Sequence, residues 1–168
     1  THEIGQAELP LMFLDFKDDY SDPDYVEQER LQVFNTSLVG LPFNPLRPSI
    51  DQHSGMVLPM AHIYQVGGIL KRVPGLGVQQ EDRLRQAIRQ AYHDVGPGEE
   101  NFQFEQEFNV PEFSILRGTL EAAPGNRELC GRLAPLFDLN LFQTGDTNQA
   151  QLASLMESRV VIRLALLP

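Results

Sequence analysis

The sequence predicts an α/β fragment in which a mainly helical insertion is flanked by terminal strands of a larger sheet. Two observations support this fold class: short apolar runs near both ends of the chain fit buried strands, and helical periodicity fills the middle. The 168 residues fit a single domain. We divide it into core strands with a Pro-rich connection over 1–48, the helical insertion over 49–156, and a core strand over 157–168.

The strands are predicted from runs of apolar residues that are too short for helices. The first covers residues 11–16, which begin Leu-Met-Phe-Leu. Residues 31–34 are a second and weaker candidate, and a proline-rich connection follows them. The chain from Arg159 onward is β-branched and apolar, which favours a buried strand. We expect the strands at the two ends to need neighbours that this chain does not supply.

The middle of the chain has the periodicity of amphipathic helices. The strongest helix is predicted over 79–95, where apolar residues recur at three- and four-residue steps, and we expect Leu84, Ile88 and Tyr92 to be core residues. A helix over 59–73 precedes it and ends at a Pro-Gly pair. Further helices are predicted over 112–122, 126–137 and 147–156.

The composition argues against several classes of function. There are 13 basic and 23 acidic residues, a net charge of -10. An acidic surface repels phosphate, so we expect little affinity of this chain for nucleic acid, and solubility is the simpler reason for the charge. Cys130 is the one cysteine and is expected to be packed rather than reactive. No apolar stretch reaches spanning length, so we expect no membrane partner and a cytoplasmic location.

The sequence lacks the motifs of nucleotide and metal chemistry. It has no G-x-x-x-x-G-K-[ST] loop, and Gly67-Gly68 lies inside a helix pattern, where it indicates a close helix contact. The four histidines are scattered without metal-ligand spacing. We therefore expect no cofactor, no metal site and no ATPase activity in this chain by itself.

Two features stand out as candidate sites. Asp15 ends the first predicted strand, and ligands of open α/β sheets bind at the carboxyl ends of strands. The alternative is an aspartate that caps a helix or forms a turn. The second feature is a set of basic residues that faces either phosphates or solvent. It comprises Lys71, Arg72, Arg83, Arg85 and Arg89.

Several short motifs follow one another along nearly the whole chain. A strand ending in an aspartate and a polar turn precedes a short strand, an Asn-Pro-Leu segment, a Gln-x-x-x-x-Leu-x-x-Ala-Ile-x-x-x-Tyr helix, a Pro-x-Phe helix start, a Gly-Arg-Leu-Ala-Pro-Leu-Phe run and a closing strand. They occupy residues 11–20, 31–34, 41–46, 79–92, 111–113, 131–137 and 160–164. In order and spacing they resemble the HerA-type family of hexameric DNA-translocating ATPases, in the HerA/FtsK class.

The resemblance implies that the chain is an internal segment between the Walker A and Walker B motifs of a RecA-like ATPase domain. The parent ATPase would use ATP and Mg²⁺ and act on double-stranded DNA as a ring. The partners of this segment would be the rest of the parent chain and neighbouring subunits. Among the relatives we favour the helicase-like component of DNA-phosphorothioation-dependent restriction, a phage-defence system.

The resemblance also implies a supporting role for Asp15 near the nucleotide, where it would orient water or a neighbouring catalytic group. A different class of protein remains as an alternative: a free-standing acidic helical module that acts by interaction and has no catalytic role.

Overall fold

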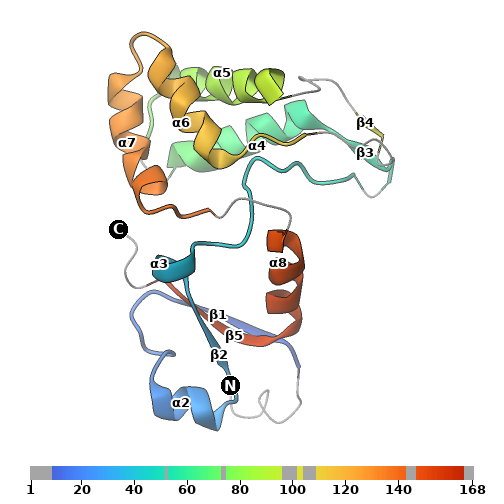
Figure 1. The fold of residues 1–168 in the computed structure, drawn as a ribbon, viewed down its shortest axis with the longest axis vertical. Helices are drawn as coiled ribbons and strands as arrows, with labels where there is room; N and C mark the ends of the chain where they lie inside the picture. The colour runs from blue at the N-terminus through green and yellow to red at the C-terminus, as the bar shows by residue number, and fades with distance from the viewer. Residues whose placement is uncertain are drawn as a thin grey trace. The chain divides into compact units, whose positions relative to one another are not determined.

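The computed structural model describes residues 9–51, 53–72, 75–95, 102–103, 109–142 and 147–164 (Figure 1). The chain divides into two compact units. One contains the residues up to 43 together with those from 138 onward, and we call it the sheet unit; the other contains residues 44–137, and we call it the helical unit. The predicted class, a mixed α/β fold with mainly helical content, is confirmed.

The sheet unit contains a parallel sheet of three strands. They are β1 (Leu11–Asp15), β2 (Gln32–Asn35) and β5 (Arg159–Arg163). Their order in the sheet is β1-β5-β2, so the last strand of the sequence lies between the first two. All three strands that the sequence predicted are present, and each begins and ends within a few residues of its expected position.

The central strand β5 is buried on both faces. Parallel strands of this kind have continuous runs of β-branched residues, which is why the Val-Val-Ile run could be recognised in the sequence. On one face, Val160 belongs to a core cluster with Leu155 of helix α8 (Thr147–Glu157). On the other face, Val161 lies opposite Phe13 of β1. The core of the sheet unit is therefore centred on β5.

Helix α2 (Pro23–Gln28) was not predicted from the sequence. Its first turn is stabilised by Asp22, whose side chain accepts hydrogen bonds from two backbone N–H groups, and a proline occupies the first helical position. Tyr25 of α2 packs edge-on against Phe13 and Tyr20, and the latter two rings stack at 4.7 Å. This aromatic cluster anchors the loop that follows β1.

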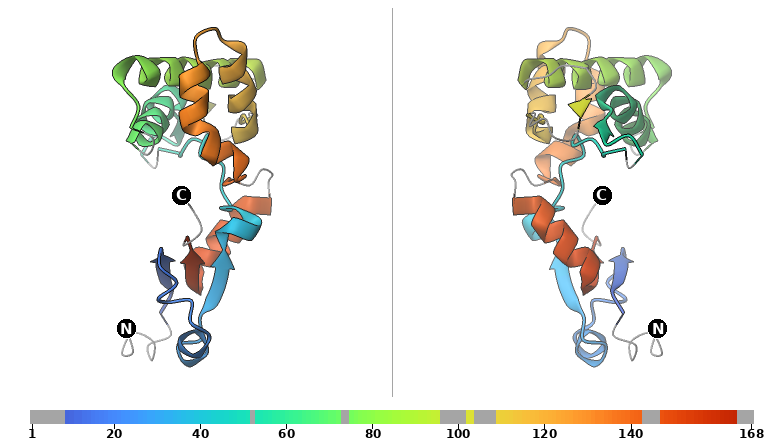
Figure 2. Two further views of the ribbon diagram at one scale, coloured as in Figure 1. Left: turned by 90° about the vertical axis from the view of Figure 1, so that its left-hand side faces the viewer. Right: turned by 90° about the vertical axis from the view of Figure 1, so that its right-hand side faces the viewer.

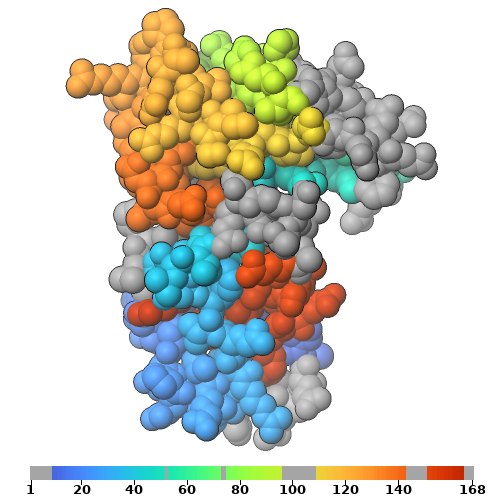
Figure 3. Space-filling model, in the orientation of Figure 1, coloured from blue at the N-terminus to red at the C-terminus, as the bar shows by residue number. Residues whose placement is uncertain are grey.

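A second short helix, α3 (Thr36–Val39), follows β2 directly. The side chain of Asn35 accepts a hydrogen bond from the N–H of Ser37, which begins the helix, and Gly40 ends it with a φ of 70°. That left-handed conformation favours glycine. In the space-filling view, α3 appears in cyan at the surface of the sheet unit (Figure 3).

In its described residues the helical unit contains four helices and a small antiparallel strand pair, and Figure 2 shows them from two further sides. Helix α5 contacts both α4 and α6. The helices begin and end within one or two residues of the predicted positions. The elements are β3 (Met56–Val57), α4 (Pro59–Arg72), α5 (Val78–Val95), β4 (Phe102–Gln103), α6 (Phe113–Ala122) and α7 (Arg127–Asp138).

The predicted apolar stripe of α5 forms the core of the helical unit. Leu84, Ile88 and Tyr92 have no exposed surface, so the expectation that they are core residues is confirmed. The hydroxyl of Tyr92 donates a hydrogen bond to the carbonyl oxygen of Leu46. The Nε2–H of His62 donates to the carbonyl oxygen of Pro45, at 2.9 Å. Two helices thus fix the proline-rich segment that enters the unit.

The helical unit is shorter than the insertion expected from the sequence. The expected insertion covered residues 49–156, whereas the unit covers 44–137. Helix α8, the last predicted helix of the insertion, packs instead on the sheet, where it contacts β1 and β5. Among the described residues, no helix has both the length and the apolar character needed to traverse a membrane.

Candidate functional site at the carboxyl edge of the sheet

The three parallel strands end at one edge of the sheet, and their last residues meet there. The strand β1 ends at Asp15, β5 at Arg163 and β2 at Asn35. The N–H of Leu164 donates to the carbonyl oxygen of Asp15 at 2.7 Å, and the hydroxyl of Thr36 donates to the carbonyl oxygen of Arg163 at 2.7 Å. The backbone at this edge is therefore held by all three strands.

The carboxylate of Asp15 organises the loop that follows β1. Asp15 is 2% exposed. Its Oδ1 accepts hydrogen bonds from the backbone N–H groups of Lys17 and Asp19, each at 3.2 Å. Its Oδ2 accepts from the N–H of Tyr20 at 3.0 Å and from the hydroxyl of Ser21 at 2.7 Å. Four donors thus converge on one buried carboxylate.

These contacts bear on the role predicted for Asp15. Burial raises its pKa, but the hydrogen bonds outweigh burial and leave the pKa below its usual value, so the side chain is charged. A carboxylate with four donors has little accepting capacity left for a ligand. Its observed contacts are those of a turn aspartate. The supporting role near a nucleotide stays a prediction, and Asp15 would exert it through the shape of the loop.

Arg163 is a residue of this edge that the sequence did not single out. Its Nε and Nη2 donate to the two carboxylate oxygens of Asp18, at 2.5 Å and 2.7 Å. The hydrogen bond from Arg163 lowers the pKa of Asp18, and the pair raises the pKa of Arg163. No signal in the sequence marks this residue, because Arg163 lies between the apolar residues 160–162 and 164–167, whereas Asp15 is followed by a polar, turn-rich segment.

The basic residues predicted as a set are not all on one face. Glu81 is contacted by the Nζ of Lys71 at 2.5 Å and by the guanidinium of Arg85. The guanidinium of Arg85 also lies 4.7 Å from the ring centroid of Tyr64. Arg83 donates instead to a backbone carbonyl in the turn between α6 and α7, at 2.5 Å. Lys71, Arg83 and Arg85 are therefore each bound within the helical unit, and they contact different partners.

The close helix contact predicted at Gly67-Gly68 is confirmed for Gly67. A methyl group at Gly67 would lie 2.9 Å from the Cγ of Arg85, closer than side-chain carbons approach other atoms. Gly68 has no atom within 4 Å of the same position. Arg89, one turn further along α5, also lies over Tyr64, 5.9 Å from the ring centroid. Gly67 is therefore the position where α4 and α5 approach each other.

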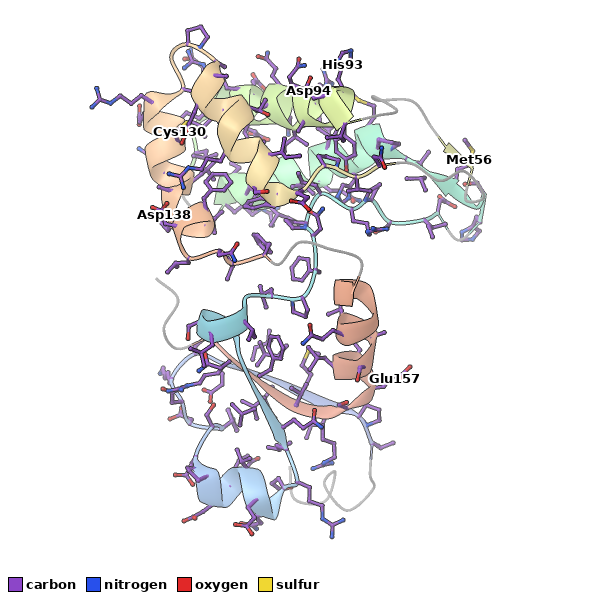
Figure 4. All side chains as sticks on the ribbon, in the orientation of Figure 1. Met56, His93, Asp94, Cys130, Asp138 and Glu157 are labelled. Carbon is purple, nitrogen blue, oxygen red and sulfur yellow. The ribbon has the colours of Figure 1, made fainter. Side chains whose placement is uncertain are left out.

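The remaining titratable side chains form no second centre in the described part of the chain. Among those residues, no three His, Cys, Asp or Glu side chains gather around a point where a metal could bind. His93 and Asp94 lie together at the exposed end of α5, and Cys130 lies on α7 (Figure 4). Cys130 is partly buried, and burial raises the pKa of its thiol, which reduces its reactivity at neutral pH.

No family model matches the chain, and no curated protein matches its sequence.

Proposed function

We propose that this chain is an internal segment of a HerA-type DNA-translocating ATPase, located between the Walker A and Walker B motifs and inactive by itself. The observation that carries the proposal is the open parallel sheet β1-β5-β2. The helical unit is inserted between β2 and β5, in the order that the family resemblance implies. In the parent ATPase these strands would be part of a RecA-like sheet.

The strand β1 supports the view that the sheet continues into another segment. Met12, Leu14 and Phe16 alternate along one side of the chain and are 39%, 56% and 67% exposed. Parallel sheets are normally covered on both faces, and free edge strands normally carry charged residues or proline. The residues of β1 before Asp15 are all apolar, and β1 has only one neighbouring strand within the described residues. Met12 and Leu14 are in register with Val160 and Ile162, so the row lies on the face that α8 covers only in part. A further strand beside β1 and a second helix on the same face as α8 would bury this row.

The carboxyl edge of the sheet supports the proposal that the parent binds ATP. In open α/β sheets, phosphate-containing ligands bind beyond the carboxyl ends of the strands. In the parent, ATP and Mg²⁺ would bind near this edge, and the ring would couple phosphoryl transfer to movement on double-stranded DNA. The biological role that we favour for such a ring is DNA-phosphorothioation-dependent restriction in phage defence.

The proposal is tested with the complete reading frame that encodes this chain. We expect the frame to contain G-x-x-x-x-G-K-[ST] upstream and an apolar strand ending in Asp-Glu downstream. The full protein should assemble into a ring and release phosphate from ATP in the presence of duplex DNA. The present chain should release no phosphate and should not retard duplex DNA in about 0.15 M salt.

A frame without these motifs, or a full protein that neither assembles nor hydrolyses ATP, would exclude the ATPase. The compact helical unit with its own core would then favour the second candidate, an acidic module that acts by interaction. Repeated phosphate release by the present chain alone, surviving repurification, would contradict the view that it is an inactive segment.

A further inference from the structure

The pair formed by Arg163 and Asp18 has the geometry of an arginine bound to a phosphate. The geometry points to Arg163 as an anion-binding residue for phosphate groups, with Asp18 as an internal competitor that occupies the guanidinium until a polyphosphate displaces it. This inference rests on the proposed function only for the identity of that polyphosphate, the triphosphate of a nucleotide. The binding site itself belongs to the present chain.

The contact between the two side chains is bidentate. Two neighbouring N–H groups of Arg163 donate to two oxygens of one carboxylate, at 2.5 Å and 2.7 Å. A guanidinium recognises carboxylate and phosphate with the same two-pronged arrangement. Asp18 therefore occupies the position on Arg163 that two phosphate oxygens would occupy.

The backbone of Arg163 is held, whereas its side chain is accessible. Arg163 ends the central strand, and its carbonyl oxygen accepts a hydrogen bond from Thr36 of the neighbouring element. The side chains of Arg163 and Asp18 are 32% and 38% exposed, so water and ions reach the pair. Exposed ion pairs are weak, which makes the carboxylate replaceable by a multivalent anion.

The position of Asp18 is imposed by the loop around Asp15. Asp18 has a left-handed backbone with a φ of 63°, a conformation that aspartate and asparagine tolerate better than most residues. The flanking N–H groups of Lys17 and Asp19 are bound to Asp15, which keeps this conformation. An asparagine at position 18 should therefore keep the loop and lose only the charge of the competitor.

The experiment is a calorimetric titration of the present chain with tripolyphosphate at low salt. The wild type should bind weakly because Asp18 occupies Arg163 and the chain is acidic. Asp18→Asn should bind about fivefold more tightly, the factor that corresponds to releasing an exposed ion pair. Asp19→Asn is the matched control, because it removes the same charge one residue away, and it should change the affinity less than about twofold.

The second arm removes the guanidinium in the Asp18→Asn background. Adding Arg163→Gln should abolish the gain, and Arg163→Lys should restore only part of it because an ammonium cannot form the fork. Equal effects of Asp18→Asn and Asp19→Asn, or a gain that survives Arg163→Gln, would overturn the inference. Circular dichroism confirms that each variant is folded. The proposed function is tested separately, by turnover in the full protein, so that either one can fail alone.

Discussion

At the scale of single residues, the sequence correctly predicted that Asp15 ends a strand, but it did not reveal which groups its side chain contacts. Asp15 was singled out because a charged residue ends an apolar run, and the structure places it at the carboxyl edge of a parallel sheet. That its carboxylate binds four donors of its own loop could not be predicted, because this depends on the path of the next six residues. Arg163 shows no such signal, because apolar residues both precede and follow it in the sequence.

The first prediction concerns Asp15→Asn in the present chain. An amide nitrogen in place of one carboxylate oxygen leaves two of the four donors without their acceptor beside a buried side chain, so the free energy of unfolding should fall by roughly 1–3 kcal/mol. This exceeds the contribution of about 0.5–2 kcal/mol expected from a simple cap. Urea unfolding provides the measurement. Asp19→Asn is the control, since only its backbone is held by Asp15; equal stability of the two variants would contradict the proposed role of the carboxylate.

A second prediction uses the adjacent glycines of α4. Gly68→Ala should raise the free energy of unfolding by about 0.5–1 kcal/mol, because alanine favours the helix and no atom lies within 4 Å of the added methyl group. Gly67→Ala should lower it, because the methyl group would displace Arg85 from its contacts with Glu81 and Tyr64. Thermal melting of both variants checks the difference in sign. Two stabilising substitutions would mean that α4 and α5 can separate at no cost.

At the scale of elements, length decided what could be predicted. The helices that were predicted have at least ten residues, enough turns for the apolar positions to repeat. The elements that were missed are too short for their periodic pattern to repeat twice: α2 has six residues, α3 four, and β3 and β4 two each. Of these elements, α2 has a recognisable start in the sequence: Asp22 followed by Pro23, since a capping residue followed by proline is typical of a helix start.

The third prediction tests the core face of α5. Ile88 has no exposed surface, so Ile88→Ala should lower the free energy of unfolding by about 2–5 kcal/mol through lost burial and a cavity. Gln86 lies on the exposed side of the same helix, and Gln86→Ala should change stability by less than about 0.5 kcal/mol. Chemical unfolding of both variants provides the comparison. An unchanged midpoint for Ile88→Ala would show that the stripe faces a partner that the isolated chain lacks.

At the scale of the whole molecule, the order of the strands was beyond the reach of the sequence. The existence of three strands follows from local composition, but their pairing depends on contacts across more than a hundred residues. Likewise, the packing of α8 on the sheet is set by Leu155 and its partners in β5. The periodicity of α8 gives no indication of which unit it joins.

The fourth prediction concerns stability at low pH. Burial lowers the pKa of His62, and its hydrogen bond to Pro45 opposes this only in part. Below the ordinary pKa of 6.5 the unfolded chain therefore binds a proton more readily than the folded one, and the free energy of unfolding falls. The pKa values of Asp15 and Glu81 are also lowered in the fold by hydrogen bonds, in opposition to burial. Their stabilisation is complete above the ordinary carboxyl values of 3.8 and 4.5 and is lost as the pH falls through the folded values.

Melting temperatures measured from pH 7.5 downward should therefore decline in two stages, a shallow one beginning at about pH 6.5 and a steep one at about pH 4. His62→Gln keeps a donor for the carbonyl of Pro45 and should remove only the shallow stage. A shallow stage of the same size in His62→Gln would assign it to other groups.

Because β5 lies between β1 and β2, the sheet can form only after β5 has been synthesised. The contact between Thr36 and Arg163 spans 127 positions of the chain. At a ribosomal rate of about 5–20 residues per second, the first two strands wait roughly 6–25 s for the strand that joins them. Throughout that interval the apolar run of β1 lacks its neighbour β5, and it is open to chaperones and to premature association with other nascent chains. The helical unit, whose contacts are more local, can fold within the same interval, so the sheet is the part that closes last.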